Sequence, residues 1–108
     1  MKTLIIIRHA KSGWDDPSLA DHDRPLSERG LRDAPRMASH IAHHVTRPDR
    51  VYTSTAVRAR TTAAFFTEAW SIEADNISEV EGLYLASRAS LCGFVEELSD
   101  ALDRVVLV

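Results

Sequence analysis

The feature that most constrains the fold is a pair of short, continuous apolar runs near the two ends of the chain. Leu4 to Ile7 is rich in β-branched residues, and the chain ends with the run Arg-Val-Val-Leu-Val over Arg104 to Val108. Apolar runs without alternating polar residues are typical of strands that are buried on both faces, as in a parallel sheet with helices on both sides. We therefore expect both runs to be inner strands of such a sheet.

Segments with helical spacing alternate with these runs. Apolar residues at helical spacing predict a helix over residues 27–45, with Ser27 as its N-cap. Pro35 lies inside this helix and should kink it or delay its regular part, because proline lacks a backbone donor. A second short strand is expected over residues 50–53, followed by a second helix that ends near Ala69.

The remainder of the chain continues this pattern. Either Ser54 or Thr55 can cap the second helix. An extended segment is expected near residues 77–80, and apolar spacing predicts a third helix over residues 88–102. This order of elements predicts an α/β fold of three layers, with a mainly parallel sheet flanked by helices. We expect one domain over residues 1–108.

The composition narrows the classes of partner. The chain has 108 residues, a formal net charge of -3 and no basic run, which argues against binding to nucleic acid or to an anionic membrane. No stretch of ~18 apolar residues is present, so no segment is expected to span a bilayer. The single cysteine, Cys92, excludes an internal disulfide framework, and the expected compartment is the cytoplasm.

Charged side chains follow two of the predicted strands. Arg8 and His9 come directly after the first strand, and Arg58 lies in the first turn of the helix that follows the second. Ligands of open α/β sheets bind beyond the carboxyl ends of the strands, so these three side chains are expected at one edge of the sheet. Forked guanidinium groups bind phosphoryl oxygens, and a neutral histidine is a competent nucleophile towards phosphorus. The pattern therefore predicts a phosphate-binding site.

Four further features of the sequence lead to separate expectations. Residues 11–25 form a loop that is long for so small a domain, which favours a functional role. Trp14, in this loop, either lines the substrate entrance or pins the loop. Arg60 points to another face of the second helix than Arg58 and is expected to be solvated and paired with a carboxylate. Cys92 lies among apolar helix residues and is expected to be buried.

Several short motifs resemble those of a known family. The stretches RHAKSGW at residues 8–14, DRPLSERG at 23–30 and STAVRARTTA at 54–63 resemble the phosphoglycerate mutase-like histidine phosphatase superfamily. Within it, the chain is most similar to the small SixA-type phosphohistidine phosphatases, which GLYLAS at residues 82–87 also resembles. The motifs occur in the family's order, so the resemblance implies a phosphoglycerate mutase-like fold.

The resemblance also implies roles for individual residues. His9 matches the histidine that is phosphorylated as nucleophile, and Arg8 and Arg58 match the arginines that bind the phosphate. The general acid implied by position is Glu81, with Glu79 as the next candidate. The implied mechanism has two steps, because His9 first takes the phosphoryl group and water then hydrolyses the phosphoenzyme. It requires no metal and no other cofactor.

The implied substrate is phosphohistidine on a protein partner. A small phosphoester is the alternative substrate, and a catalytically silent phosphate-binding module is the alternative to an enzyme. The family carries a second histidine in a G-H-N/D-like motif directly after the strand that residues 104–108 resemble. The sequence ends at Val108, before such a motif, so we expect the C-terminal part of the family's fold to be missing.

Overall fold

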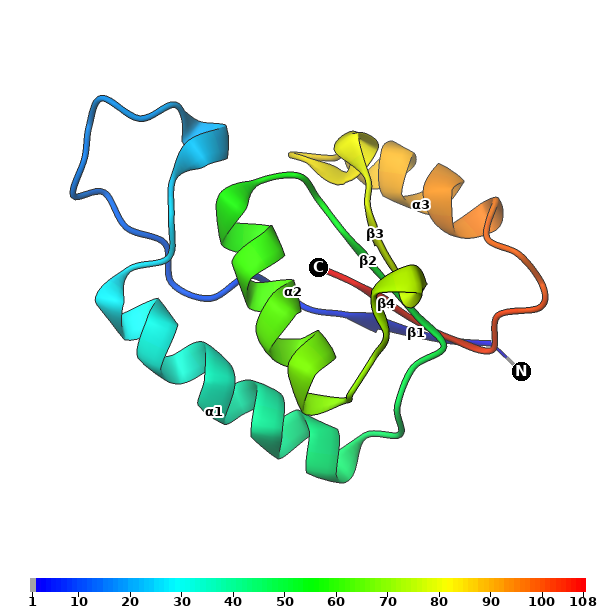
Figure 1. The fold of residues 1–108 in the computed structure, drawn as a ribbon. Coiled ribbons are helices and arrows are strands. Elements are labelled where there is room, and N and C mark those ends of the chain that lie inside the picture. Colours follow the sequence, from blue (N-terminus) through cyan, green and yellow to red (C-terminus); the bar gives the residue numbers. More distant parts are fainter. Residues whose placement is uncertain (1) are drawn as a thin grey trace.

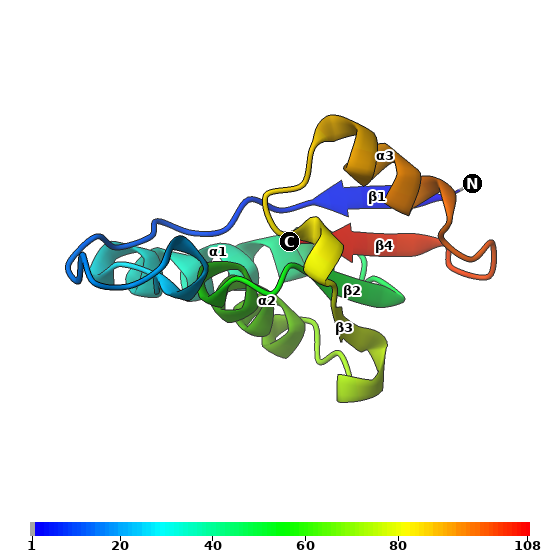
Figure 2. The same ribbon diagram turned by 90° about the horizontal axis from the view of Figure 1, so that it is seen from above.

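A computed structural model describes residues 2–108, which contain one sheet of four parallel strands. The strands follow one another across the sheet in the order β1-β4-β2-β3, as Figure 2 shows. Their bounds are Thr3–Ile6 for β1, Arg50–Thr53 for β2, Ile77–Glu79 for β3 and Arg104–Leu107 for β4. The parallel pairing confirms the predicted sheet, and it places the carboxyl ends of all four strands at one edge.

Helices cover both faces of this sheet. The helices α1 (Glu28–His44) and α2 (Val57–Ala69) lie side by side on one face, and α3 (Arg88–Glu96) lies on the other (Figure 1). Short 3-10 turns, η1 (Asp21–Asp23), η2 (Ala74–Asn76) and η3 (Glu81–Leu83), connect the larger elements. The predicted three-layer α/β architecture is therefore confirmed.

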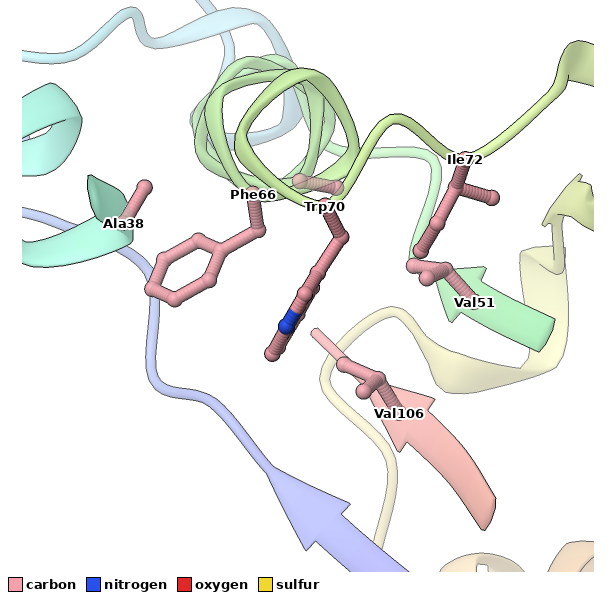
Figure 3. Close-up of a cluster of buried hydrophobic side chains, with 7 residues drawn as sticks. Ala38, Val51, Phe66, Trp70, Ile72 and Val106 are labelled. Carbon is pink, nitrogen blue, oxygen red and sulfur yellow. The ribbon is translucent and has the colours of Figure 1, made fainter. Parts of the chain in front are cut away.

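The main core lies between α2 and the sheet. Trp70, at the end of α2, projects towards Val106, and Phe66 of α2 lies between Trp70 and Ala38 of α1 (Figure 3). Val51 and Val106 of the sheet belong to the same cluster and are fully buried. Burying a large apolar side chain contributes roughly 1.5–3 kcal/mol. The indole N–H of Trp70 donates to the carbonyl oxygen of Val45 at 3.1 Å, so its polar atom is satisfied as well. The core thus fixes α2, and with it the start of that helix, against the sheet.

The two apolar runs that were expected to be inner strands behave differently. Strand β4 lies between β1 and β2, and its Val105 and Val106 are fully buried, as predicted. For β1 the prediction is wrong, because Leu4 and Ile6 are 38% and 71% exposed. Strand β1 is at the edge of the sheet, and α3 leaves an open apolar groove of about 700 Å³ beside it.

Helix α1 agrees with its prediction at its start and along most of its length. The hydroxyl oxygen of Ser27 accepts a hydrogen bond from the backbone N–H of Gly30 at 3.1 Å, so Ser27 is the N-cap. The helix continues through Pro35, which removes a single backbone donor. One apolar residue of this helix, Leu31, is nevertheless 47% exposed.

The third helix is shorter than predicted. Helix α3 ends at Glu96, and the chain then turns through hydrogen bonds between residues three apart, such as Leu98 N–H to Val95 O. Turning at this point lets Leu98 and Leu102 still pack on the sheet. The expected burial of Cys92 is wrong, because this residue is exposed and lines the open groove beside β1.

Candidate functional site

The first part of the site is the segment that leaves β1. The parallel pairing with β4 extends one residue beyond β1, through Ile7 N–H to Leu107 O at 2.8 Å, and Arg8 and His9 follow. The Nδ1 atom of His9 lies 2.7 Å from the carbonyl oxygen of Ala10. A carbonyl oxygen only accepts hydrogen bonds, so Nδ1 carries the proton. In the neutral ring, the lone pair is then on Nε2, which is the atom available as nucleophile.

The second part of the site is the turn from β2 into α2. Arg58 lies in the first turn of α2 and is only 7% exposed. The predicted capping of this helix by Ser54 or Thr55 is wrong, because the N-cap position is Ala56. The Ser54 hydroxyl instead accepts from the backbone N–H of Ala56 at 3.3 Å and shapes the turn before the helix.

A buried hydroxyl group joins these two parts. Thr62 on α2 is 2% exposed, and its Oγ1 accepts from the backbone N–H of Ala10 at 3.0 Å. The same hydroxyl donates to the carbonyl oxygen of Arg58 at 2.8 Å. Bonding to the carbonyl four residues earlier is common for threonine in helices. Here it also fixes the backbone beside His9 against α2.

The two parts enclose a cavity of about 190 Å³ at the carboxyl edge of the sheet. Arg8, His9 and Arg58 all line it, so the structure brings together the three residues that the strand-end pattern selected. The other lining residues come from the ends of β1 and β4, from the start of α2 and from the segment around η3: Ile7, Ser54, Ala56, Ala59, Leu83, Tyr84, Leu85 and Val108. Two guanidinium groups beside an imidazole suit a phosphoryl group chemically.

A carboxylate that the sequence did not single out binds Arg58. Asp21 of η1 accepts from Arg58 twice, at its carbonyl oxygen (Nη1, 2.6 Å) and at Oδ2 (Nη2, 2.9 Å). The Tyr84 hydroxyl donates to the same Oδ2 at 2.6 Å, and Arg24 Nη1 donates to Oδ1 at 3.0 Å. These hydrogen bonds lower the pKa of the Asp21 carboxyl to about 2, with the largest contribution from Tyr84 and the next from Arg58. The bond to Asp21 raises the pKa of Tyr84 above its ordinary value.

Arg24 holds the long loop over residues 11–25 in shape. It is buried, and it donates to the carbonyl oxygen of Gly13 at 3.1 Å and to the Ser12 hydroxyl at 2.5 Å. Its guanidinium carbon lies 3.2 Å from the centre of a Trp14 ring. Trp14 is nevertheless 73% exposed and lines a second cavity, of about 380 Å³, together with Arg8 and His9. Both suggested places for Trp14 therefore apply: it packs on the loop and it borders the site.

The two glutamates considered as general acids lie elsewhere. Glu81 is an exposed residue of η3 and is not among the residues that line the 190 Å³ cavity. Its role as an acid therefore stays a prediction without support from this geometry. Glu79 pairs with Arg60, with 3.3 Å between Arg60 Nε and Glu79 Oε1. This ion pair confirms the expectation for Arg60, whose side chain is 46% exposed.

Neither a metal centre nor a membrane span is found in residues 2–108. In this part of the chain, no group of three or more histidine, cysteine, aspartate or glutamate side chains is placed to bind a metal ion. No helix among these residues combines the length and the apolar character that crossing a bilayer requires.

Comparison with known proteins identifies the family. The family model for the histidine phosphatase superfamily (branch 1) matches residues 4–83. The chain belongs to the histidine phosphatase superfamily. Within the superfamily it is similar to solved SixA structures. It superimposes with a TM-score of 0.89 on the crystal structure of a putative phosphohistidine phosphatase SixA from Agrobacterium tumefaciens, at 29% identity over 100% of this chain and 69% of that one.

Two further relatives agree with this assignment. The structure of a putative phosphohistidine phosphatase SixA from Nakamurella matches with a TM-score of 0.81 and 31% identity, over 99% of this chain and 58% of that one. An uncharacterised chloroplastic protein of Arabidopsis thaliana is 31% identical over 97% of this chain. The chain spans only 46% of that relative's length.

Proposed function

We propose that this histidine phosphatase hydrolyses phosphohistidine on a protein partner, with His9 as the nucleophile. The observation that carries the proposal is the cavity in which Arg8 and Arg58 accompany a histidine whose Nδ1 is bound to the Ala10 carbonyl. That hydrogen bond directs the lone pair of a neutral ring to Nε2, and both guanidinium groups keep their positive charge at working pH.

The reaction has two displacement steps. In the first, the lone pair of His9 Nε2 forms a bond to phosphorus while the P–N bond to the partner's imidazole breaks, and the departing nitrogen takes up a proton. In the second, water attacks phosphorus, the bond to Nε2 breaks, and inorganic phosphate leaves. Arg8 and Arg58 would stabilise the negative charge that is spread over the phosphoryl oxygens in both steps.

Two features of the cavity favour a protein substrate over a small phosphoester. Its volume of about 190 Å³ is below the ~300–1,000 Å³ that is typical of sites which enclose a small molecule. Leu85 and Trp14, which border the two cavities beside His9, are 74% and 73% exposed. Exposed large apolar side chains around a site are typical of surfaces that contact another protein. The names of the similar SixA structures support the same substrate class.

Transfer from a phosphorylated histidine protein tests the proposal. The chain is incubated with a ³²P-labelled histidine phosphotransfer protein and, in parallel, with p-nitrophenyl phosphate. We expect release of phosphate from the protein substrate, a labelled enzyme intermediate that acid destroys, and far weaker hydrolysis of the ester. His43→Ala, on the exposed end of α1, is the matched control for His9→Ala.

Each result assigns the chain to one of the alternatives. Preferential hydrolysis of the ester would identify a small-molecule phosphatase instead. Binding of phosphate without turnover of either substrate would identify a silent binding module. Turnover that survives in His9→Ala would show that His9 is not the nucleophile.

A further inference from the structure

We propose that Asp21 is a positioning residue of this site, whose carboxylate holds the Arg58 guanidinium and the loop over residues 11–25 in the arrangement that receives a phosphoryl group. The proposal rests on the proposed function in that it assumes a phosphoryl ligand in the cavity with Arg58. It adds Asp21 to the candidate site, a residue that lies outside both the Arg-His motif and the second-arginine motif.

The first argument is the geometry between Asp21 and Arg58. Asp21 binds both terminal nitrogens of Arg58, one through its backbone carbonyl and one through Oδ2, at 2.6 and 2.9 Å. Two contacts from one residue fix the plane of the guanidinium as well as its position. The guanidinium has five N–H groups, and these two bonds use two of them. The plane is therefore fixed while donors remain for phosphoryl oxygens.

The second argument is the environment of Arg58. Its side chain is only 8% exposed, and a buried cation without a partner is costly. In the free protein, Asp21 provides that partner. The Asp21 side chain itself is 43% exposed, so the pair lies at the boundary between the protein and solvent.

The third argument is that the same carboxylate joins three separate segments. Oδ2 binds Tyr84, which follows η3, as well as Arg58 of α2, and Oδ1 binds Arg24. Arg24 in turn binds Gly13 and Ser12, in the part of the loop that follows His9. Loss of the carboxylate would therefore loosen Arg58 and the loop together.

Binding of inorganic phosphate, measured by calorimetry, is the main test. For Asp21→Asn we expect the Kd for phosphate to rise about tenfold, since hydrogen bonds between charged groups contribute on the order of that factor. Asp23→Asn is the matched control: it removes a carboxylate from the same turn, and among residues 2–108 the Asp23 carboxylate pairs only with His22, at 3.4 Å. Its Kd should stay within about twofold of the original value. Circular dichroism at the same temperature establishes that both variants are folded.

Two results would overturn the proposal. If Asp21→Asn binds phosphate as tightly as the original chain, the carboxylate does not position Arg58. If it binds phosphate more tightly, Asp21 is instead an internal competitor for Arg58.

Should Asp21→Asn fail to fold, Tyr84→Phe replaces it, because this change removes only the hydroxyl bond to Oδ2. We expect this variant to raise the Kd about threefold, and unchanged binding would contradict the proposal.

A second readout separates this proposal from the proposed function. Trp14 is exposed and stacks on Arg24, whereas Trp70 is 5% exposed, so acrylamide quenching of fluorescence reports mainly on Trp14. We expect quenching to increase in Asp21→Asn and to stay the same in Asp23→Asn. If the original chain binds no phosphate, the proposed function fails, yet quenching still tests Asp21. Equal quenching in Asp21→Asn and the original chain would show that the carboxylate does not order the loop.

Discussion

The two strand ends that build the site differ in how firmly their charged groups are fixed. At the end of β2, Arg58 is buried and bound by Asp21 at two points. At the end of β1, Arg8 is exposed, and no carboxylate among residues 2–108 pairs with it within 4.0 Å. One guanidinium is thus held in place by a carboxylate, whereas the other has no such partner among the described residues.

This difference has a structural cause. Strand β2 leads directly into α2, whose apolar side packs on the core through Phe66, so Arg58 is carried by a rigid element. Strand β1 leads into a long loop, and the next helix, α1, begins only at Glu28. One of the contacts that connect this loop to α2 is the hydrogen bond from the Ala10 N–H to Thr62. The comparison supports the proposed roles, in which Arg58 at the β2 end is the fixed part of the site and His9 at the β1 end is the nucleophile.

The largest expected effect comes from removing the proposed nucleophile, His9. We expect His9→Ala to lower turnover of a phosphohistidine protein by at least about a thousandfold, because no covalent intermediate can form. Phosphate binding should change far less, since both arginines remain. Rapid-quench detection of the phosphoenzyme and calorimetry with phosphate measure the two effects. Equal losses in turnover and in binding would mean that His9 acts only as a ligand.

Exchanging each arginine for lysine sharpens the comparison between the strand ends. We expect Arg58→Lys to lower kcat/KM about a hundredfold, because an ammonium group cannot bind both Asp21 and the phosphoryl oxygens with a planar fork. Arg8→Lys should lower kcat/KM only about tenfold, since Arg8 has no carboxylate partner among residues 2–108 to lose. Arg58→Lys alone should also lower Tm, as measured by calorimetry. Similar effects of the two variants on kcat/KM and Tm would contradict the proposal that Arg58 is held in place by Asp21 while Arg8 is not.

A smaller effect is expected where the loop meets α1. A Cβ atom on Gly30 would overlap with the Lys11 carbonyl oxygen, so the backbone of this segment must shift. We expect Gly30→Ala to lower the free energy of unfolding by about 1–3 kcal/mol, the usual cost of overpacking. Urea denaturation measures this change. Gly93→Ala is the control, because an added Cβ there meets no atom within 4 Å.

The smallest effect is the dependence of stability on acid. Because the folded-state pKa of Asp21 is lowered from 3.8 to about 2, its contribution to stability is present above pH 3.8 and is lost as the pH falls through about 2. We therefore expect Tm to fall between pH 4 and 2 less steeply in Asp21→Asn than in the original chain. Scanning calorimetry over this range makes the comparison, and parallel curves would show that the carboxylate is not stabilised by folding.

The sequence predicts the elements and the three residues of the cavity for local reasons. Apolar spacing along α2 depends only on neighbouring residues, and Ala59, Ala63 and Phe66 are all buried as that spacing requires. Arg8, His9 and Arg58 could be placed together because parallel strands end at a common edge. The end of α3 could not be predicted in this way, because packing on the sheet outweighs helical periodicity there.

What the sequence by itself determined is therefore the type of most elements and which strand ends carry the candidate site residues. Only the tertiary structure decided that β4 is buried on both faces and β1 on one, because strand order does not follow from the composition of either run. It also decided that Asp21 binds Arg58 and Tyr84, which lie 37 and 63 residues further along the chain. No local pattern marks such a contact, since it forms only when the folded sheet brings the three segments together.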